Sequence, residues 1–175
     1  MFERSTLPPL FSSNGTEVIP IRERSKYNVG RDVSGRTYDG IVFDSAMEMK
    51  YYRDVVLPGL ESGDIVKFER QKPYTLQPKF THGNVKVRAI VYVADFYIVY
   101  SDGREVVIDI KGAADSLAKC KRKLFWYTHP EVDYIWLTYV KKYGGWVDWD
   151  EANQRRRAER KLRMEHEEEE DNGEE

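Results

Sequence analysis

One stretch, residues 91–112, constrains the fold more than any other part of the chain. Its sequence is VYVADFYIVYSDGREVVIDIKG, two runs rich in β-branched and aromatic residues on either side of Ser101-Asp102-Gly103. That composition and spacing predict a β-hairpin. The strands also carry Asp95, Asp109 and Lys111. Charged side chains in a sheet cost free energy unless they are paired, bind a metal or take part in chemistry. We therefore interpret the hairpin as the floor of an active site.

The apolar residues of both strands alternate with the charged ones. Because alternate residues of a strand point to the same face, each strand is expected to have one apolar face. These faces consist of Ala94, Phe96, Ile98 and Tyr100 on the first strand and Val106, Ile108 and Ile110 on the second. The charged side chains Asp95, Asp109 and Lys111 are then expected on the other face.

The length of the turn decides whether the two carboxylates meet. A two-residue turn would place Asp95 opposite Ile110 and would separate the carboxylates. A three-residue loop, 101–103, with its glycine in the left-handed conformation, places Asp95 opposite Asp109. The hydrophobic pattern needs this second register, because a slip by one residue would bury charges. We therefore predict a three-residue loop or a bulge.

Two carboxylates and a lysine on one face suit a divalent cation. Carboxylate oxygens are hard ligands, and Mg²⁺ takes one or two of them together with waters and substrate phosphates. The backbone carbonyl of Ile110 is a further ligand, and Lys111 can hold or deprotonate an attacking water or stabilise negative charge. The alternative is a surface hairpin with an ordinary Lys–Asp ion pair, which would contribute little to stability.

An acidic residue also stands at the start of a predicted helix. Residues 38–43 predict a short strand leading into a helix from Ser45 to about Leu57, where Pro58-Gly59 is expected to end it. Ser45 and Glu48 have the spacing of a capping box. Glu48 can therefore cap its own helix or belong to the site, and the residue pattern leaves both roles open.

The rest of the chain alternates strands and helices. Strands are expected at 64–71 and 74–80, then at 85–100 as one long strand or a bent pair after a turn at 82–84. A helix is expected at 115–128, a core strand at 132–140 parallel to its neighbour, a short edge strand or turn at 146–149, and a last helix from Asp150.

The helix at 115–128 carries basic residues directly after the carboxylate hairpin. These candidate phosphate-binding residues are Lys119, Lys121, Arg122 and Lys123. Basic side chains on a helix beside a metal site make good phosphate contacts. An ordinary solvated helix face is the alternative.

Charge is unevenly distributed along the 175 residues. Residues 165–175 hold eight acidic residues and no Lys or Arg, so the rest carries all 28 basic residues and 22 of the 30 acidic ones. A mildly basic body is compatible with nucleic-acid binding. We divide the chain into a basic, irregular arm (1–37), a core domain (38–149), and a charged helix with an acidic tail (150–175). That helix either faces nucleic acid or is solvated and held by ion pairs with Glu159 and the tail.

Several classes of protein are disfavoured by the sequence. A long apolar run and a signal core are both missing, so we expect no membrane association. The single Cys120 excludes an intrachain disulfide and fits a reducing compartment, which predicts a cytoplasmic location. The sequence has no Gly-rich phosphate loop, no zinc-type Cys/His spacing and no nucleophile elbow. We therefore expect no organic cofactor.

The order of these parts resembles the PD-(D/E)XK nuclease superfamily, in which a helix acid precedes an Asp on one strand and a D-x-K triplet on the next. More narrowly, the chain resembles DUF1064, a family of small phage and prophage proteins, over about residues 26–140. The matching pieces are Lys26-Tyr27-Asn28, Phe43-Asp44-Ser45 with Glu48, Leu76-Gln77-Pro78, Tyr92 to Phe96, Asp109 to Gly112, and Lys121 to Phe125. Ala94 stands where the superfamily motif has proline.

This resemblance implies a restriction-endonuclease-like α/β core with a central mixed sheet flanked by helices. It implies Mg²⁺- or Mn²⁺-dependent hydrolysis of DNA phosphodiesters, with Lys111 as the motif lysine. The implied catalytic residues are Glu48, Asp95, Asp109 and Lys111, and the implied metal ligands are Asp95, Asp109, Glu48 and the Ile110 backbone carbonyl. The basic residues of the 115–128 helix are the expected DNA-binding residues.

Relatives of this type include endonucleases that resolve branched DNA, usually as dimers. The expected function is therefore a homodimeric endonuclease, with a Holliday junction as a candidate substrate, acting in the cytoplasm of a host cell. A site-specific or nicking endonuclease and an exonuclease are alternatives with the same chemistry. A non-catalytic DNA-binding accessory protein that keeps the nuclease fold is an alternative of another class.

Overall fold

The computed structural model describes residues 32–172, with side chains to residue 168. Residues 1–31, which hold most of the predicted basic arm, and residues 173–175 of the predicted tail lie outside the described residues. In chain order the elements are η1 (Ser34–Arg36), β1 (Thr37–Tyr38), β2 (Ile41–Val42), α1 (Ala46–Tyr51), η2 (Tyr52–Val56), α2 (Leu57–Ser62), β3 (Ile65–Gln77), β4 (Phe80–His82), β5 (Val85–Val87), β6 (Ile90–Tyr100), β7 (Glu105–Ile110), α3 (Ser116–Thr128), β8 (Asp133–Val140), η3 (Lys141–Tyr143), β9 (Gly145–Asp148) and α4 (Trp149–Asn172).

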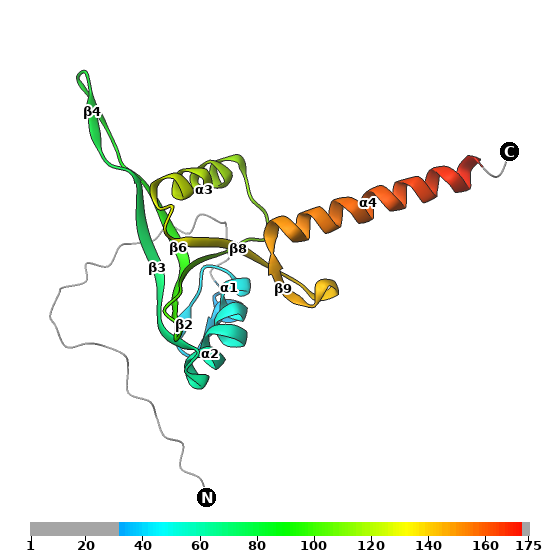
Figure 1. Ribbon diagram of the computed structural model, residues 1–175, viewed down its shortest axis with the longest axis horizontal. Helices are drawn as coiled ribbons and strands as arrows, with labels where there is room; N and C mark the ends of the chain where they lie inside the picture. The colour runs from blue at the N-terminus through cyan, green and yellow to red at the C-terminus, as the bar shows by residue number, and fades with distance from the viewer. Residues whose placement is uncertain (1–31, 173–175) are drawn as a thin grey trace, which may run out of the picture. The chain divides into compact units, whose positions relative to one another are not determined.

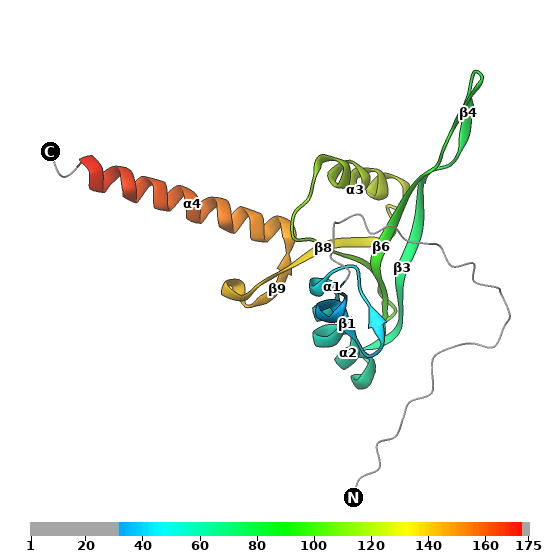
Figure 2. The ribbon, with the colours of Figure 1, turned by 180° about the vertical axis from the view of Figure 1, so that it is seen from behind.

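A five-stranded mixed sheet in the order β3-β6-β7-β8-β9 forms the centre of the fold. Its neighbours are antiparallel except for β7 and β8, which are parallel and are connected through α3. The helical segments α1, η2 and α2 cover one face of the sheet and α3 covers the other (Figures 1 and 2). This arrangement confirms the predicted fold class, an α/β core with a mixed sheet flanked by helices.

Each face of the sheet has its own hydrophobic core. On the α1–α2 side, Phe43, Tyr51 and Val56 pack against Phe96 and Ile108 of the sheet. On the α3 side, the buried residues are Leu76, Tyr92, Ala94, Tyr97, Val107, Phe125, Tyr134 and Trp136. The central strand β7 is therefore buried on both faces, and this makes the charged Asp109 at its end unusual.

The loop between β6 and β7 has the predicted length. The Tyr100 N–H donates to the Arg104 carbonyl (2.9 Å), the Gly103 N–H donates to the Tyr100 carbonyl (3.0 Å), and Gly103 has φ +86°. The ladder runs from Val99–Glu105 to Phe96–Ile108. One further step along both strands reaches Asp95 and Asp109, so the three-residue loop and the predicted register are confirmed.

The predicted apolar face of β6 is wrong at one position. Phe96, Ile98 and Tyr100 lie in the α1–α2 core as expected, but Ala94 lies in the α3 core. The physical reason is an irregularity at Asp95. The β3–β6 ladder passes from Lys72–Ala94 to Arg70–Phe96 without pairing Gln71 with Asp95, and Gln71 has φ +54°. The side chains of β6 change face at this point, and Asp95 lies there.

Two predicted boundaries next to prolines are also wrong. The first helix does not end at Leu57; it continues through Pro58 to Ser62, and the left-handed Gly63 ends it. The π-helical turn η2 directly precedes Pro58, so the missing proline N–H coincides with a change in hydrogen-bond register. Likewise, β3 runs straight through Pro73, because β3 is an edge strand, where proline is tolerated.

The remaining elements follow the expectations with one exception. The single strand predicted at 38–43 is a hairpin, β1–β2, whose turn residues Asp39 and Gly40 both have positive φ, as a tight type I′ turn requires. The stretch 85–100 forms the bent pair β5 and β6. The predicted helix at 115–128, the parallel core strand, the edge strand and the last helix are found as α3, β8, β9 and α4. Among the described residues, no helix is both long and apolar enough to span a membrane.

Replacement of Gly103 tests the loop that sets the β6–β7 register. Because Gly103 adopts φ +86°, Gly103→Ala is expected to lower the free energy of unfolding by about 1 kcal/mol. Chemical denaturation measures the change. Gly35→Ala is the matched control, because Gly35 lacks positive φ and has open space around it. Equal effects of the two substitutions would contradict the proposed role of the loop.

Candidate active site

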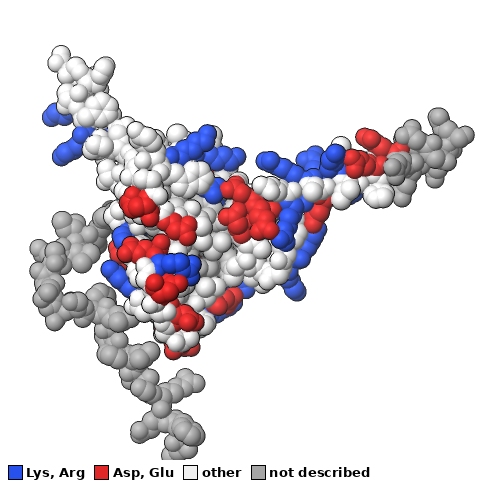
Figure 3. Space-filling model, viewed as in Figure 1, with Lys and Arg blue, Asp and Glu red and all other residues white. Residues whose placement is uncertain are grey.

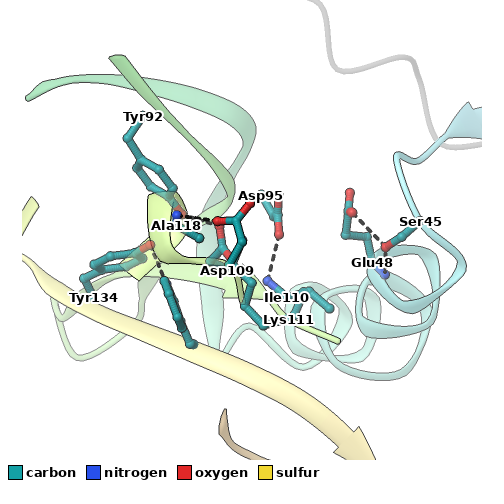
Figure 4. A network of polar contacts seen from close by, with 11 residues as sticks. Ser45, Glu48, Tyr92, Asp95, Asp109, Ile110, Lys111, Ala118 and Tyr134 are labelled. Carbon is teal, nitrogen blue, oxygen red and sulfur yellow. Dashed lines mark hydrogen bonds and ion pairs between the residues drawn. The ribbon is translucent and has the colours of Figure 1, made fainter. Parts of the chain in front are cut away.

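The two aspartates lie side by side at the point where β6 and β7 stop pairing. The last paired residues are Phe96 and Ile108. Beyond them, the Asp95 carboxylate accepts a hydrogen bond from the Ile110 N–H (2.7 Å). A side chain therefore takes the place of a backbone acceptor at the end of the β6–β7 ladder. Figure 4 shows Asp95 and Asp109 adjacent, with Lys111 at the end of the same strand. The structure thus brings together three residues predicted from the sequence.

Asp109 is held by two partners inside the protein. Its side chain is only 2% exposed. The Tyr92 hydroxyl donates to Oδ1 (2.5 Å), and the Lys111 ammonium forms an ion pair with Oδ2. Tyr134 lies next to Tyr92, with 5.3 Å between ring centroids. These contacts fix the direction of one carboxylate oxygen and balance the charge of the other.

Sequence reasoning missed the two tyrosines. Tyr92 lies three residues before Asp95, where the strand period does not predict a shared face, and only the change of face at Asp95 aligns its hydroxyl with Asp109. Tyr134 comes from the parallel strand β8, where it pairs with Val107, and the residues alone do not predict the register of that pairing. No local sequence signal could have identified either tyrosine as part of the site.

Glu48 serves as a helix cap beside the aspartates. The Ser45 hydroxyl accepts from the Glu48 N–H (3.1 Å) and donates to its carboxylate (2.7 Å), and the Asp44 N–H donates to the other carboxylate oxygen (3.3 Å). The predicted capping interaction is therefore confirmed. Glu48 is also 6% exposed, and its charge acts on Asp95. A role for Glu48 in the site stays a prediction.

The start of α1 packs next to the end of β7. A Cβ at Gly112, directly after Lys111, would lie 3.7 Å from the Cε atom of Met47. Residues 113–115 then lead into α3, where the Asp115 carboxylate accepts from the Ala118 N–H (2.7 Å) as the N-cap. Glu48 of α1 therefore lies to one side of Asp95 (Figure 4), and α3 begins five residues after Lys111.

Two acidic side chains of the site, Asp95 and Glu48, have raised pKa values. Burial raises the pKa of Asp95 well above its usual range; the nearby charges of Asp109 and Glu48 raise it further, whereas the Ile110 N–H bond and Lys111 oppose the shift. Burial raises the pKa of Glu48 to about 7, and the hydrogen bond from Ser45 partly opposes this shift. Crowded carboxylates of this kind are typical of functional sites.

The arrangement can hold a divalent cation with few protein ligands. In residues 32–172, no group of three or more His, Cys, Asp and Glu side chains is placed to hold a metal ion. Two carboxylates, Asp95 and Asp109, nevertheless suffice for Mg²⁺, which keeps several waters and needs only one or two carboxylates. A cation would also relieve the repulsion that raises the pKa of Asp95. The Ile110 carbonyl and Glu48 are the nearby oxygens available in addition.

The four predicted phosphate-binding residues of α3 divide into two pairs. Lys119 and Lys123 are exposed. The Lys121 ammonium donates to the Val91 carbonyl (2.8 Å), and Arg122 forms an ion pair with Asp150 at the start of α4 (2.6 Å). Lys121 and Arg122 therefore support the structure, and phosphate binding by the four residues stays a prediction.

Several charges of α4 are paired within the helix itself. The i,i+4 pairs are Glu151–Arg155, Lys161–Glu165 and Arg163–Glu167, and Lys142 reaches Glu159 from η3 (2.5 Å). Lys and Arg gather on the first part of α4, and Asp and Glu gather toward its end (Figure 3). These pairings match a solvated helix, the second of the two alternatives drawn from the sequence.

Comparison with known protein families assigns the chain to one family. Residues 24–145 match the family described as "Protein of unknown function (DUF1064)". The match covers most of the chain and includes Glu48, Asp95, Asp109 and Lys111, so this protein belongs to the DUF1064 family. No curated protein matches the sequence.

Glu48→Gln tests the buried carboxyl of the site through its effect on stability. Because folding raises the pKa of Glu48 from 4.5 to about 7, Glu48 stabilises the fold below pH 4.5, and this contribution is lost as the pH rises through 7. Gln does not titrate, and its single amide oxygen can accept one of the two hydrogen bonds that the Glu48 carboxylate accepts. Without metal, the variant should gain stability relative to wild type between these pH values, by up to roughly 3 kcal/mol.

Thermal unfolding at several pH values in EDTA measures this difference. Glu61→Gln is the control, because Glu61 is an exposed glutamate on α2 of the same helical run. We expect no comparable pH-dependent gain for the control. A constant difference between Glu48→Gln and wild type across the pH range would show that Glu48 is not a buried, titrating acid.

Proposed function

We propose that this protein is a metal-dependent endodeoxyribonuclease of the PD-(D/E)XK type that hydrolyses DNA phosphodiester bonds. The observation that carries the proposal is the adjacency of Asp95 and Asp109 at the end of the β6–β7 ladder, with Lys111 paired to Asp109. Its sequence support is the D-x-K triplet together with the helix acid Glu48. Membership of the PD-(D/E)XK superfamily and a phage or prophage origin are part of the proposal.

The proposed cofactor is Mg²⁺ or Mn²⁺, held by Asp95 and Asp109 with the Ile110 carbonyl and Glu48. Such an ion, when bound, lowers the pKa of a water and stabilises charge on a phosphoryl oxygen. The protein groups prepare the two carboxylates for this task. The Ile110 N–H orients Asp95, and the Tyr92 hydroxyl orients Asp109. Both are therefore fixed before a ligand arrives, which lowers the cost of binding.

Lys111 has two tasks in this proposal. Its ammonium balances the charge of the buried Asp109 and lies 5.4 Å from the ring centre of Trp136, which limits its freedom. From this position it can hold the attacking water or stabilise negative charge on the phosphoryl group in the transition state. Glu48, with a pKa of about 7, can exchange a proton near neutral pH or join the metal ligands once deprotonated.

Branched DNA, with a Holliday junction as the reference example, is the substrate that we propose, cut by a homodimer in the cytoplasm of a host cell. This part of the proposal rests on the resemblance to phage junction-resolving endonucleases. Residues from one chain form the metal site described above, so a dimer would bring two such sites to the two strands that a resolvase must cut.

Cleavage by wild type and Asp109→Asn tests the proposed activity. Four-way junction, linear duplex and single-stranded DNA are incubated with Mg²⁺, with Mn²⁺ and with EDTA. We expect metal-dependent cutting, fastest on the junction, and a loss of roughly 100-fold or more in Asp109→Asn. Asp102→Asn, in the exposed β6–β7 loop, is the matched control and should cut like wild type. Cutting that persists in EDTA or in Asp109→Asn would overturn the assigned chemistry.

A wild type that binds DNA but cuts none of these substrates with either metal would instead support the accessory-protein alternative. This outcome is distinguishable from misfolding, because the same preparation can be checked by its cooperative unfolding transition.

Metal binding can be measured without activity. The unfolding temperature of wild type should rise with Mg²⁺ near pH 7.5, because binding only the folded state stabilises by about 2.7 kcal/mol at a hundredfold excess over Kd. Asp95→Asn should lose most of this rise, since a carboxylate ligand is missing, whereas Asp102→Asn should keep it. A rise that is the same in all three proteins would place the ion elsewhere.

A further inference from the structure

The outward face of α3 carries two aromatic rings that its packing does not require. Tyr127 is 85% exposed and Trp126 is 45% exposed. Burial would normally be favourable for side chains of this size. Their neighbour Phe125 shows the contrast, because it is fully buried in the core beneath α3. The exposed rings therefore need an explanation other than the fold.

The helical period places these rings and two lysines on one strip. Successive residues turn by about 100° around a helix, so Lys119, Lys123, Trp126 and Tyr127 fall within an arc of about 100°. All four are exposed, and Lys121 and Phe125 lie outside the arc and face the protein. We call this strip of Lys119, Lys123, Trp126 and Tyr127 the α3 strip. Its first half carries positive charge and its second half carries aromatic surface.

Trp126 is held rigidly in the α3 strip. The Arg122 guanidinium lies 4.5 Å from the Trp126 ring centre and 4.4 Å from that of the buried Trp136, and Asp150 fixes it by an ion pair (2.6 Å). Arg122 thus connects Trp126 to the sheet and to α4. A ring held in this way presents its surface to a ligand at little cost in conformational entropy.

We propose that the α3 strip binds unpaired nucleotides of the DNA strand that enters the active site, with bases stacked on Trp126 and Tyr127 and phosphates on Lys119 and Lys123. Aromatic rings combined with basic side chains are the chemistry by which proteins bind single strands irrespective of sequence. This inference rests on the proposed nuclease function and makes it more specific: the substrate contains a single-stranded segment beside the cleaved bond.

The position of α3 relative to the aspartates supports this assignment. Only residues 112–115 separate Lys111 from Ser116, the first residue of α3. From Ser116 to Tyr127 the helix extends about 16 Å, the length of a few nucleotides. A strand whose phosphate lies at the aspartates can therefore follow α3 along the strip.

The test is a comparison of binding affinities in EDTA, where no cleavage takes place. The full chain, Tyr127→Ala, Tyr127→Phe and Leu117→Ala are titrated onto a short labelled single strand and onto the duplex of the same sequence. Leu117 is the control, because it is 61% exposed on α3 but lies outside the strip. Tyr127→Ala should bind the single strand about 5- to 30-fold more weakly, as expected from the loss of one stacked base.

Tyr127→Phe keeps the ring, and Leu117→Ala keeps the strip, so both should stay within about twofold of wild type. The affinity for duplex should change far less than that for the single strand in Tyr127→Ala. Unchanged binding of the single strand by Tyr127→Ala, or an equal loss for duplex, would overturn the inference. It would leave a protein partner as the explanation of the exposed rings.

Cys120 offers a second measurement that needs no variant. It is the only cysteine of the chain, it is exposed, and it lies one helical turn before Lys123, at the edge of the α3 strip. A saturating single strand should slow the reaction of Cys120 with a maleimide by several-fold, and the duplex should slow it less. An unchanged rate under saturation would contradict binding along the strip.

These binding results are independent of the nuclease activity. If the single strand binds in a stacking-dependent way but no substrate is cut, the proposed nuclease function is contradicted and the α3 strip is still supported as a nucleic-acid site. If cleavage depends on metal but Tyr127→Ala binds the single strand like wild type, the nuclease function is supported and nucleic-acid binding by the α3 strip is contradicted.

Discussion

The constraint on which the surrounding structure depends is a buried carboxylate, Asp109, next to a partly buried one, Asp95. Asp95 and Asp109 repel each other and are costly to remove from water. The Tyr92 hydroxyl, the Ile110 N–H and the Lys111 ammonium offset part of this cost. The part of this cost that they do not offset is seen in the raised pKa of Asp95. The protein thus stores an unfavourable electrostatic interaction that binding of a cation would relieve.

Three irregular features of the fold lie around this pair. The β6–β7 ladder ends there, the side chains of β6 change face at Asp95, and Gln71 on the neighbouring strand takes a strained backbone conformation. Strained residues are often found at functional sites. Glu48 follows the same principle, because one carboxylate both caps α1 and adds to the charge around Asp95.

Much of this arrangement could be predicted from local patterns. The alternation of apolar residues and the Ser-Asp-Gly turn were enough to place Asp95 opposite Asp109, and the capping spacing identified the bonds of Glu48. Non-local contacts could not be predicted in this way. The role of Tyr92 depends on the change of face in β6. The role of Tyr134 depends on the pairing of β7 with β8, a parallel strand that follows α3 in the chain. The ion pair of Arg122 with Asp150 joins residues 28 positions apart, so the sequence pattern did not indicate it. Pro58 and Pro73 led to wrong predictions of where an element ends, because a helix with a π-helical turn tolerates Pro58 and an edge strand tolerates Pro73.

The long edge strand β3 has a consequence for how copies of this protein can assemble. An edge of 13 residues would ordinarily invite another strand to extend the sheet, which leads to dimers or to aggregation. Pro73 removes a donor from β3, and the positive φ of Gln71 bends the backbone two residues earlier. The sheet is thereby protected against open-ended growth along this edge, so a second copy is not expected to extend the sheet beside β3.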